Sequence, residues 1–190
     1  MTHPVDENTV AWPSASKFKL SNVFAGDSGA GYYYEGRDFS QAEHSGTHTD
    51  APAHFCRDRW HTADIPMEHL VAPGVKVSIK GRADIDQDTM LTVQDLQDWE
   101  EVNGRIPDKS VVLVYTGRGR LYGDKDRYFG RPEGLDLEDT DTKHLHFPGV
   151  SPEAADWLVK NRAIVGLGID TPSTDRGQSK MFETHQVDYI

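Results

Sequence analysis

Cysteine is almost absent from this sequence, and Cys56 is the single one among 190 residues. A disulfide within the chain is therefore impossible, so the fold depends on packing and hydrogen bonding. We interpret Cys56 as an inert packing thiol, because the chemistry developed below needs no cysteine nucleophile.

Long apolar runs are also missing. No stretch approaches the length of about 20 apolar residues that a membrane-spanning helix requires. The first residues, MTHPVDENTV, show no basic region followed by an apolar run, which is the pattern of a secretory signal. The expectation from these two absences is a cytoplasmic protein that does not enter a membrane.

Basic residues are outnumbered, with 20 Lys and Arg against 31 Asp and Glu, for a formal net charge of −11. Binding to a phosphate backbone needs clustered Lys and Arg, whereas here the basic residues are scattered among acidic ones. Nucleic acid and an anionic membrane surface are therefore poor partners for this chain.

The length fits one domain with a proper core, and the sequence contains no repeat or linker. Apolar patterns predict strands at residues 75–80, 111–116 and 164–170. Residues 1–40 look irregular, and residues 117–148 look like a long functional or mobile loop. Arg118 and Arg120 in that loop are expected to be solvated.

Two helices are indicated by their capping residues. Thr92 can cap a helix through about residue 103, with Asp95 at the capping-box position and Gly104 as the stop. Ser151 can cap a second helix to about residue 161, with Pro152 in its first turn. The order of strands and helices predicts an α/β fold with a mixed sheet.

Metal-ligand residue types are concentrated at His44, His48, Asp50 and His54, within 11 residues. A helix would scatter these side chains, and the nearby glycine and proline also disfavour one. In an extended chain the four even-numbered positions point to one face. The pattern therefore predicts binding of a divalent metal.

The spacing within this group leaves two alternatives open. Positions 48 and 50 are close enough to share one ion, at roughly 3.3 Å per residue in a strand. Positions 44 and 48 would lie about 13 Å apart in a straight strand, which is too far. Either the chain bends at Gly46, as a glycine permits, or two metals are bound.

The stretch H-S-G-T-H-T-D-A-P-A-H-F at residues 44–55 resembles the signature H-x-G-T-H-x-D-x-P-x-H-F of the metal-dependent cyclase family. That family includes bacterial kynurenine formamidases and isatin hydrolases. The resemblance continues at Trp12-Pro13, at the strand ending in Thr116-Gly117, and at residues 147–158 and 165–173. These ordered motifs extend over nearly the whole chain.

The resemblance implies a swivelling β/β/α fold and hydrolysis of a small amide, formamide or lactam through a metal-activated water. It implies metal ligation by His44, His48, Asp50 and His185, and a catalytic role for His54. One or two ions of Zn²⁺ or Mn²⁺ suit such ligands. The implied partners are a small-molecule substrate and other copies of the chain, in a homo-oligomer of two or more.

The family's closing segment includes a glutamate about a dozen residues after the histidine that His185 matches. This chain ends at Ile190, so we expect residues 1–190 to form a single cyclase-like domain without that segment. A second hypothesis follows, in which the chain is a truncated and inactive relative that serves as a metal-binding or oligomeric interaction protein.

Aromatic residues supply candidates for substrate contact. Trp12, Phe39 and Trp60 could line a pocket for an aromatic substrate. The alternative for each of them is a place in the core or at an interface. The sequence does not distinguish the two interpretations.

Overall fold

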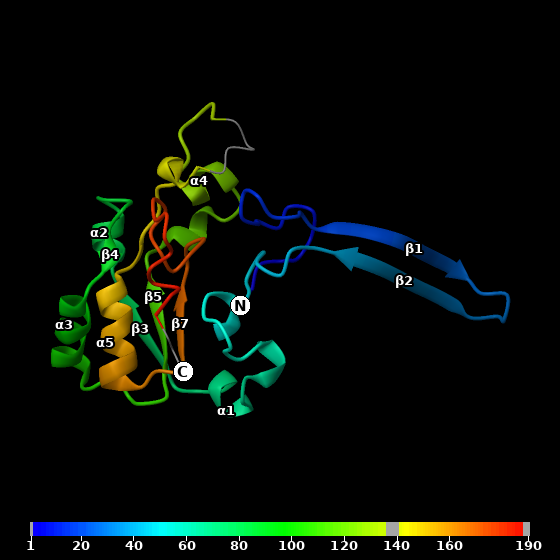
Figure 1. Cartoon of the computed structure of the whole chain (residues 1–190). Helices are drawn as coiled ribbons and strands as arrows, with labels where there is room; N and C mark the ends of the chain where they lie inside the picture. The colour runs from blue at the N-terminus through cyan, green and yellow to red at the C-terminus, as the bar shows by residue number, and fades with distance from the viewer. Residues whose placement is uncertain (1, 136–140, 188–190) are drawn as a thin grey trace. The chain divides into compact units, whose positions relative to one another are not determined.

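The computed structural model describes residues 2–135 and 141–187 of the chain. The chain forms two compact units, the first up to Thr49 and the second from Asp50 onward (Figure 1). Within the described residues, none of the helices combines the length and the apolar character needed to cross a bilayer.

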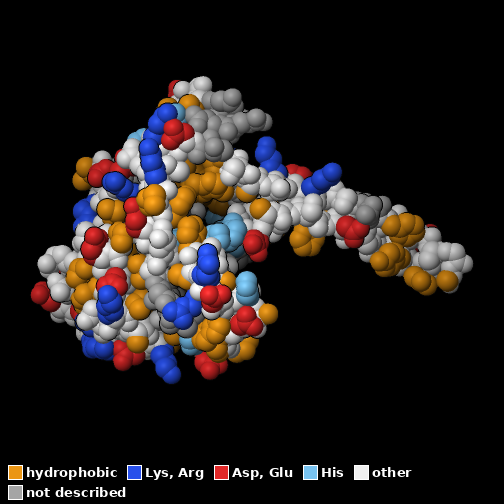
Figure 2. Space-filling view, in the orientation of Figure 1, with side chains coloured by type: hydrophobic (Ala, Val, Ile, Leu, Met, Phe, Trp, Pro, Cys, Tyr) orange, Lys and Arg blue, Asp and Glu red, His pale blue; other side chains and the backbone are white. Residues whose placement is uncertain are grey.

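The first unit contains a hairpin of two antiparallel strands, β1 (Lys19–Asp27) and β2 (Tyr33–Ser40). The expectation that residues 1–40 are irregular is therefore wrong. The hairpin escaped detection because all but one of the β2 residues are exposed, so the strand has no apolar–polar alternation. Hydrophobic side chains gather near the end of the hairpin (Figure 2).

The second unit is built on a parallel sheet in the order β3-β5-β7, formed by Gly74–Ser78, Val111–Tyr115 and Gly166–Ile169. All three predicted strands are confirmed. A second parallel pair joins β4 (Met90–Leu91) to β6 (Gly149–Val150). The α/β class is confirmed, and the parallel and antiparallel strands lie in separate sheets.

Both predicted helices are confirmed as α3 (Val93–Asn103) and α5 (Pro152–Arg162). The Thr92 side chain accepts from the Asp95 backbone N–H at 3.3 Å, and Asp95 accepts from the Thr92 N–H at 2.8 Å. The Ser151 side chain caps α5 by accepting from the Ala154 backbone N–H at 3.1 Å. Both helices lie on one face of the β3–β5–β7 sheet (Figure 1).

The core of the second unit lies between that sheet and the two helices. The alternating valines of β3 and β5 point toward the helices, which turn fully buried apolar side chains back to them. The buried cluster consists of Val75, Val77, Ile79, Leu91, Leu96, Ile106, Val112, Val114, Val150, Ala154, Ala155, Leu158 and Ile164. This continuous packing makes the sheet a rigid support for the segments that follow its strands.

The remaining segments carry short helical turns. Before β3 these are the 3₁₀ turns η1 (Pro52–His54) and η2 (Thr62–Asp64) and helix α1 (Met67–Leu70). Helix α2 (Lys80–Ala83) follows β3. The region expected as a loop at residues 117–148 contains η3 (Arg118–Leu121), α4 (Lys125–Phe129) and η4 (Thr142–His144), while residues 136–140 lie outside the described part.

Arg118 in this region is buried, and the expectation that it is solvated is wrong. Its guanidinium donates to the Tyr128 carbonyl at 2.9 Å and to the His146 carbonyl at 2.6 Å. A buried cation needs several such acceptors, and this one connects three parts of the loop. Arg120 remains largely exposed and pairs with Asp84 at 3.2 Å.

Candidate metal centre

The segment that begins at His44 bends at Gly46, whose φ of +65° lies in the left-handed region that favours glycine. The bend is held by backbone contacts, because the Gly46 N–H donates to the Val10 carbonyl at 2.7 Å. The Ser45 hydroxyl donates to the Ala42 carbonyl at 2.6 Å. Of the two alternatives left open by the spacing, the bend is the one observed.

The expected extended chain through His54 is wrong. Residues 43–47 form bends and an isolated bridge, and Pro52 opens the turn η1, which ends at His54. The fixed φ of proline suits the first position of a helical turn, which explains the change of conformation there. His44, His48 and Asp50 therefore meet because the chain folds back at the bend. The expectation that an extended chain places His54 on the same face does not hold.

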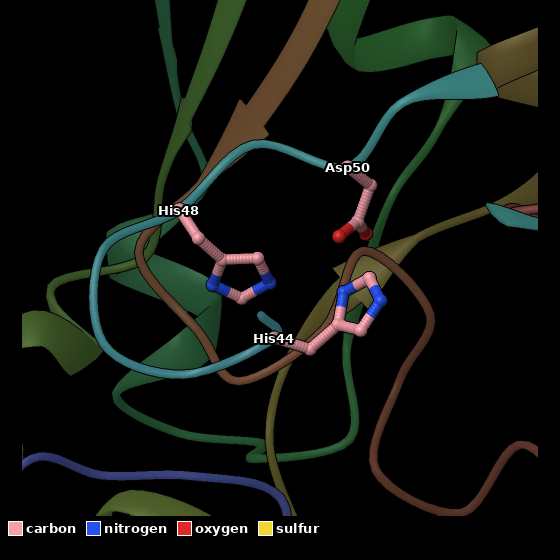
Figure 3. A group of neighbouring side chains, drawn as sticks. All are labelled: His44, His48 and Asp50. Atoms are coloured by element: carbon pink, nitrogen blue, oxygen red, sulfur yellow. The ribbon is translucent and has the colours of Figure 1, made fainter. Parts of the chain in front are cut away.

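His44, His48 and Asp50 come together as a result of the bend. Each of them offers one ligand atom, and these atoms lie within 4.8 Å of one another. Figure 3 shows the three side chains directed into a common space. His44 and Asp50 are half-buried, whereas His48 is exposed. One ring nitrogen of His48, Nδ1, lies 3.0 Å from the Gly46 carbonyl oxygen, and this contact orients the ring.

The donor set is chemically suitable for a divalent metal. Two imidazoles and one carboxylate are the ligand types of zinc sites, and they also suit manganese. Three protein ligands leave coordination positions for other groups, as in catalytic rather than structural zinc sites. Among the described residues, the group of mutually close ligand atoms contains these three side chains and not His185.

His185 lies instead beside Asp50, with its Nε2 atom 3.6 Å from Asp50 Oδ2. The side chain of His185 is 14% exposed. Burial alone would lower the pKa of His185, but its hydrogen bonds to Asp175 and Asp50 outweigh burial and raise that pKa to about 9. The Asp175 and Asp50 carboxylates therefore favour the protonated form of His185.

Sequence reasoning missed Asp175, the second of these carboxylates. Asp175 is 2% exposed, and it accepts from the Thr184 N–H at 2.7 Å and from the His185 N–H at 3.2 Å. It also pairs with His185 Nδ1. Burial alone would raise its pKa, but the hydrogen bonds from His185 and Thr184 lower it. The available signal was its position five residues after Asp170, just beyond the family motif that ends at Ser173.

The parallel sheet positions this part of the site. Asp170 follows β7 directly and accepts from both the backbone N–H and the hydroxyl of Thr116, each at 2.8 Å, so it joins the carboxyl ends of β7 and β5. Ligand sites in α/β proteins gather beyond those ends. Gly149 allows the segment at Asp175 and Arg176 to pack closely against β6, because a Cβ at position 149 would lie 2.3 Å from the Arg176 backbone nitrogen.

Aromatic rings surround His185 within the second unit. The ring centroid of Phe55 lies 4.7 Å from that of His185, and Phe182 lies 6.1 Å from it. His54, the predicted catalytic residue, is exposed at the end of η1, with its ring centroid 6.1 Å from that of His185. His54 is therefore a neighbour of His185.

The three predicted substrate contacts lie in different local settings. Trp60 packs against His69, with 5.5 Å between ring centroids, and is half-buried. Phe39 is 66% exposed and stacks on Phe18 at 5.9 Å in the first unit. Trp12 is half-buried in the same unit. Their contact with substrate stays a prediction.

Comparison with known proteins identifies relatives of the whole arrangement. The family model described as "Putative cyclase" matches residues 1–176. An isatin hydrolase from Roseibium aggregatum is 30% identical over 141 residues, covering 72% of this chain and 50% of that protein. A kynurenine formamidase from Geobacillus thermodenitrificans is 23% identical over 185 residues, covering 95% of this chain and 71% of the relative.

Solved structures show the same fold. Isatin hydrolase A from Ralstonia solanacearum superposes with a TM-score of 0.83 at 30% identity, covering 100% of this chain and 73% of that chain. The chain thus spans about half the length of the isatin hydrolase from Roseibium aggregatum and about three quarters of the solved one. Because the family model matches well over half of the chain, the chain belongs to the cyclase family.

Proposed function

We propose that this protein is a metal-dependent hydrolase of a small amide, formamide or lactam. The observation that carries the proposal is the group formed by His44, His48 and Asp50, whose ligand atoms lie within 4.8 Å of one another. The names of the two relatives, a kynurenine formamidase and an isatin hydrolase, support the substrate class, because they describe hydrolysis of a formamide and of a cyclic amide.

In the proposed site, His44, His48 and Asp50 would hold a divalent ion, Zn²⁺ or Mn²⁺, and His185 lies beside Asp50, with its Nε2 atom 3.6 Å from Asp50 Oδ2. Such an ion, when bound, supplies positive charge that polarises a carbonyl group and acidifies a water molecule. Asp50 would also be available to a second ion, because a carboxylate has two oxygens and one of them faces His185.

His54 is the proposed proton carrier. Imidazole exchanges protons near neutral pH, and the ring of His54 lies exposed at the end of η1, where a substrate can reach it. In the proposed reaction, His54 takes a proton as water attacks the carbonyl carbon and returns a proton to the departing nitrogen. The carbon–nitrogen bond breaks, and the products are an acid and an amine.

The test combines metal analysis with turnover. The purified chain is depleted with a chelator, reloaded with Zn²⁺ or Mn²⁺ and assayed with N-formylkynurenine and with isatin. We expect turnover of at least one substrate to disappear on depletion and to return on reloading. Full metal occupancy without turnover of any amide, lactam or lactone would contradict the proposal and favour the inactive metal-binding relative.

We also propose that the chain assembles into a homo-oligomer of two or more copies. The support comes from the hairpin, which exposes 50% of Phe24 and 61% of Tyr33. An isolated hairpin is only marginally stable in water, and exposed aromatic residues are enriched at protein interfaces. Light scattering of the purified chain is expected to give at least twice the mass of one chain, and a monomer would contradict this.

A further inference from the structure

Asp175 is a buried carboxylate that the proposed hydrolysis does not use. With 2% of its surface exposed, it is one of the least accessible charged residues of the described chain. Burying a carboxylate is costly unless hydrogen bonds compensate, and Asp175 is compensated by two backbone N–H groups and by one ring nitrogen of His185. The concentration of these contacts on one residue needs an explanation.

The Asp175 carboxylate is fixed in place by its neighbours. Its oxygen Oδ1 accepts from the Thr184 N–H at 2.7 Å, and Thr184 is fully buried. The Thr184 hydroxyl in turn donates to the Val150 carbonyl of β6 at 2.7 Å. The turn that carries His185 is thereby connected through Asp175 and Thr184 to the sheet framework, so neither partner of the pair can move independently.

The two ring nitrogens of His185 have different partners. Nδ1 pairs with Asp175 Oδ2, and Nε2 faces Asp50 Oδ2 at 3.6 Å. A carboxylate only accepts hydrogen bonds, so its partner nitrogen must carry the proton. When the imidazole is neutral, Nδ1 therefore keeps its proton and Nε2 presents a lone pair toward the Asp50 side.

We propose that Asp175 is a positioning residue that holds His185 with Nδ1 protonated and Nε2 directed at the metal position beside Asp50. The proposal rests on the proposed function, because that function supplies the metal ion toward which Nε2 is directed. Carboxylates that accept from the second nitrogen of a ligating histidine fix its tautomer and ring orientation, and their loss typically weakens metal affinity by about 10- to 100-fold.

A second Asp–His pair in the same unit provides a matched control. His146 Nδ1 lies 2.8 Å from Asp88 Oδ2, so the chemical groups are the same. That pair is more exposed, with 32% of the His146 side chain and 29% of the Asp88 side chain accessible. Neither residue has a role in the proposed site.

The first experiment measures the tautomer in the wild-type chain. Ring ¹⁵N NMR is recorded without metal at high pH, where the imidazole is neutral, and the His185 signals are identified by their loss in His185→Gln. We expect the Nδ1–H form, which is the minor tautomer of free histidine. The Nε2–H form would overturn the proposal, even if the chain binds no metal, so its failure differs from failure of the proposed function.

The second experiment compares Asp175→Asn with Asp88→Asn. Thr184 and His185 bond to different oxygens of Asp175, and Asp175→Asn replaces one of these oxygens with an NH₂ donor, so one of the two contacts is lost. We expect Zn²⁺ or Mn²⁺ affinity, measured by calorimetry, to fall by about 10- to 100-fold in Asp175→Asn and to stay unchanged in Asp88→Asn. Unchanged affinity together with unchanged His185 ring shifts would overturn the proposal. If Asp175→Asn does not fold, the wild-type spectrum decides.

Discussion

Leu96 and Val112 are fully buried between α3 and β5, whereas His48 lies exposed just beyond the bend at Gly46. The first two residues belong to regular elements with long runs of backbone hydrogen bonds. His48 belongs to a segment of bends, where its conformation depends on a few directed contacts such as that to the Gly46 carbonyl. Packing thus holds the framework, and individual hydrogen bonds hold the candidate ligands.

This difference implies that stability and function can be changed separately. A buried leucine contributes through the apolar area it removes from water and through the cavity its loss would leave. An exposed histidine contributes little to folding, so its loss should affect the site alone. Core variants should therefore lose stability and keep the function of the site, whereas site variants should lose function and keep stability. A variant that loses both would show that the two regions are coupled.

His48→Ala should have the largest effect on function. Loss of one of three ligands should reduce bound metal to a small fraction and turnover to the level of the buffer, while the free energy of unfolding, compared between the metal-free proteins, changes by less than about 0.5 kcal/mol. Metal content by mass spectrometry, turnover and urea unfolding measure the three quantities. His61→Ala, which removes an exposed histidine elsewhere, is the control. A His48→Ala protein that retains metal would show that His48 is not a ligand.

His54→Ala tests whether His54 acts as a metal ligand or as a proton carrier. Removal of a general acid–base group typically lowers turnover by about 10²- to 10⁴-fold. We expect that loss with metal content near the wild-type value, because His54 is not part of the three-residue ligand group. If the variant loses its metal instead, His54 is a ligand and another residue must carry the proton.

Leu96→Ala tests the framework. Leu96 is fully buried in the core cluster, and truncation of such a leucine costs about 2–5 kcal/mol. The free energy of unfolding in urea should fall by that amount, while metal bound per folded molecule stays constant. Val102→Ala in the same helix is the control, because Val102 is 83% exposed and its truncation should cost less than about 0.5 kcal/mol. Loss of metal from folded Leu96→Ala would mean that core and site are coupled.

The framework could be predicted from the sequence because its signals are local. Thr92, Asp95 and Gly104 mark the ends of α3 through side chains next to those ends. Alternating valines mark β3, and a continuous β-branched apolar run marks β5. Burial and periodicity are strong in this region, and the predicted elements agree with the observed ones to within a few residues.

The site and the hairpin of the first unit could be predicted only in part. The histidine motif indicated the group of His44, His48 and Asp50 and gave a bend at Gly46 as one of two alternatives, because these residues lie in one short stretch. The pairing of Asp175 with His185 depends on a turn that brings residues ten positions apart together, and no local pattern marks it. The β1–β2 hairpin was missed because nearly every residue of β2 is exposed, which removes the alternation that identifies strands.

Glu100→Gln should have the smallest effect on stability, and that effect should depend on pH. Glu100 in α3 accepts from Arg162 Nε at 2.6 Å at the end of α5 and from the Ile106 N–H at 2.7 Å. The hydrogen bond from Arg162 holds the pKa of Glu100 below its usual value of 4.5. A lowered folded-state pKa adds stability that is complete above the unfolded value and is lost as pH falls through the folded value.

The wild-type chain should therefore lose more thermal stability than Glu100→Gln between about pH 6 and pH 3, since the variant has no carboxylate to protonate at this position. Melting temperatures across that range measure the difference, and Glu101→Gln, at the exposed neighbouring position, is the control. At pH 6 the variant should be slightly less stable, because the helix-to-helix ion pair is gone. Parallel curves for the two proteins would mean that this pair contributes nothing to the framework, leaving apolar packing as the connection between α3 and α5.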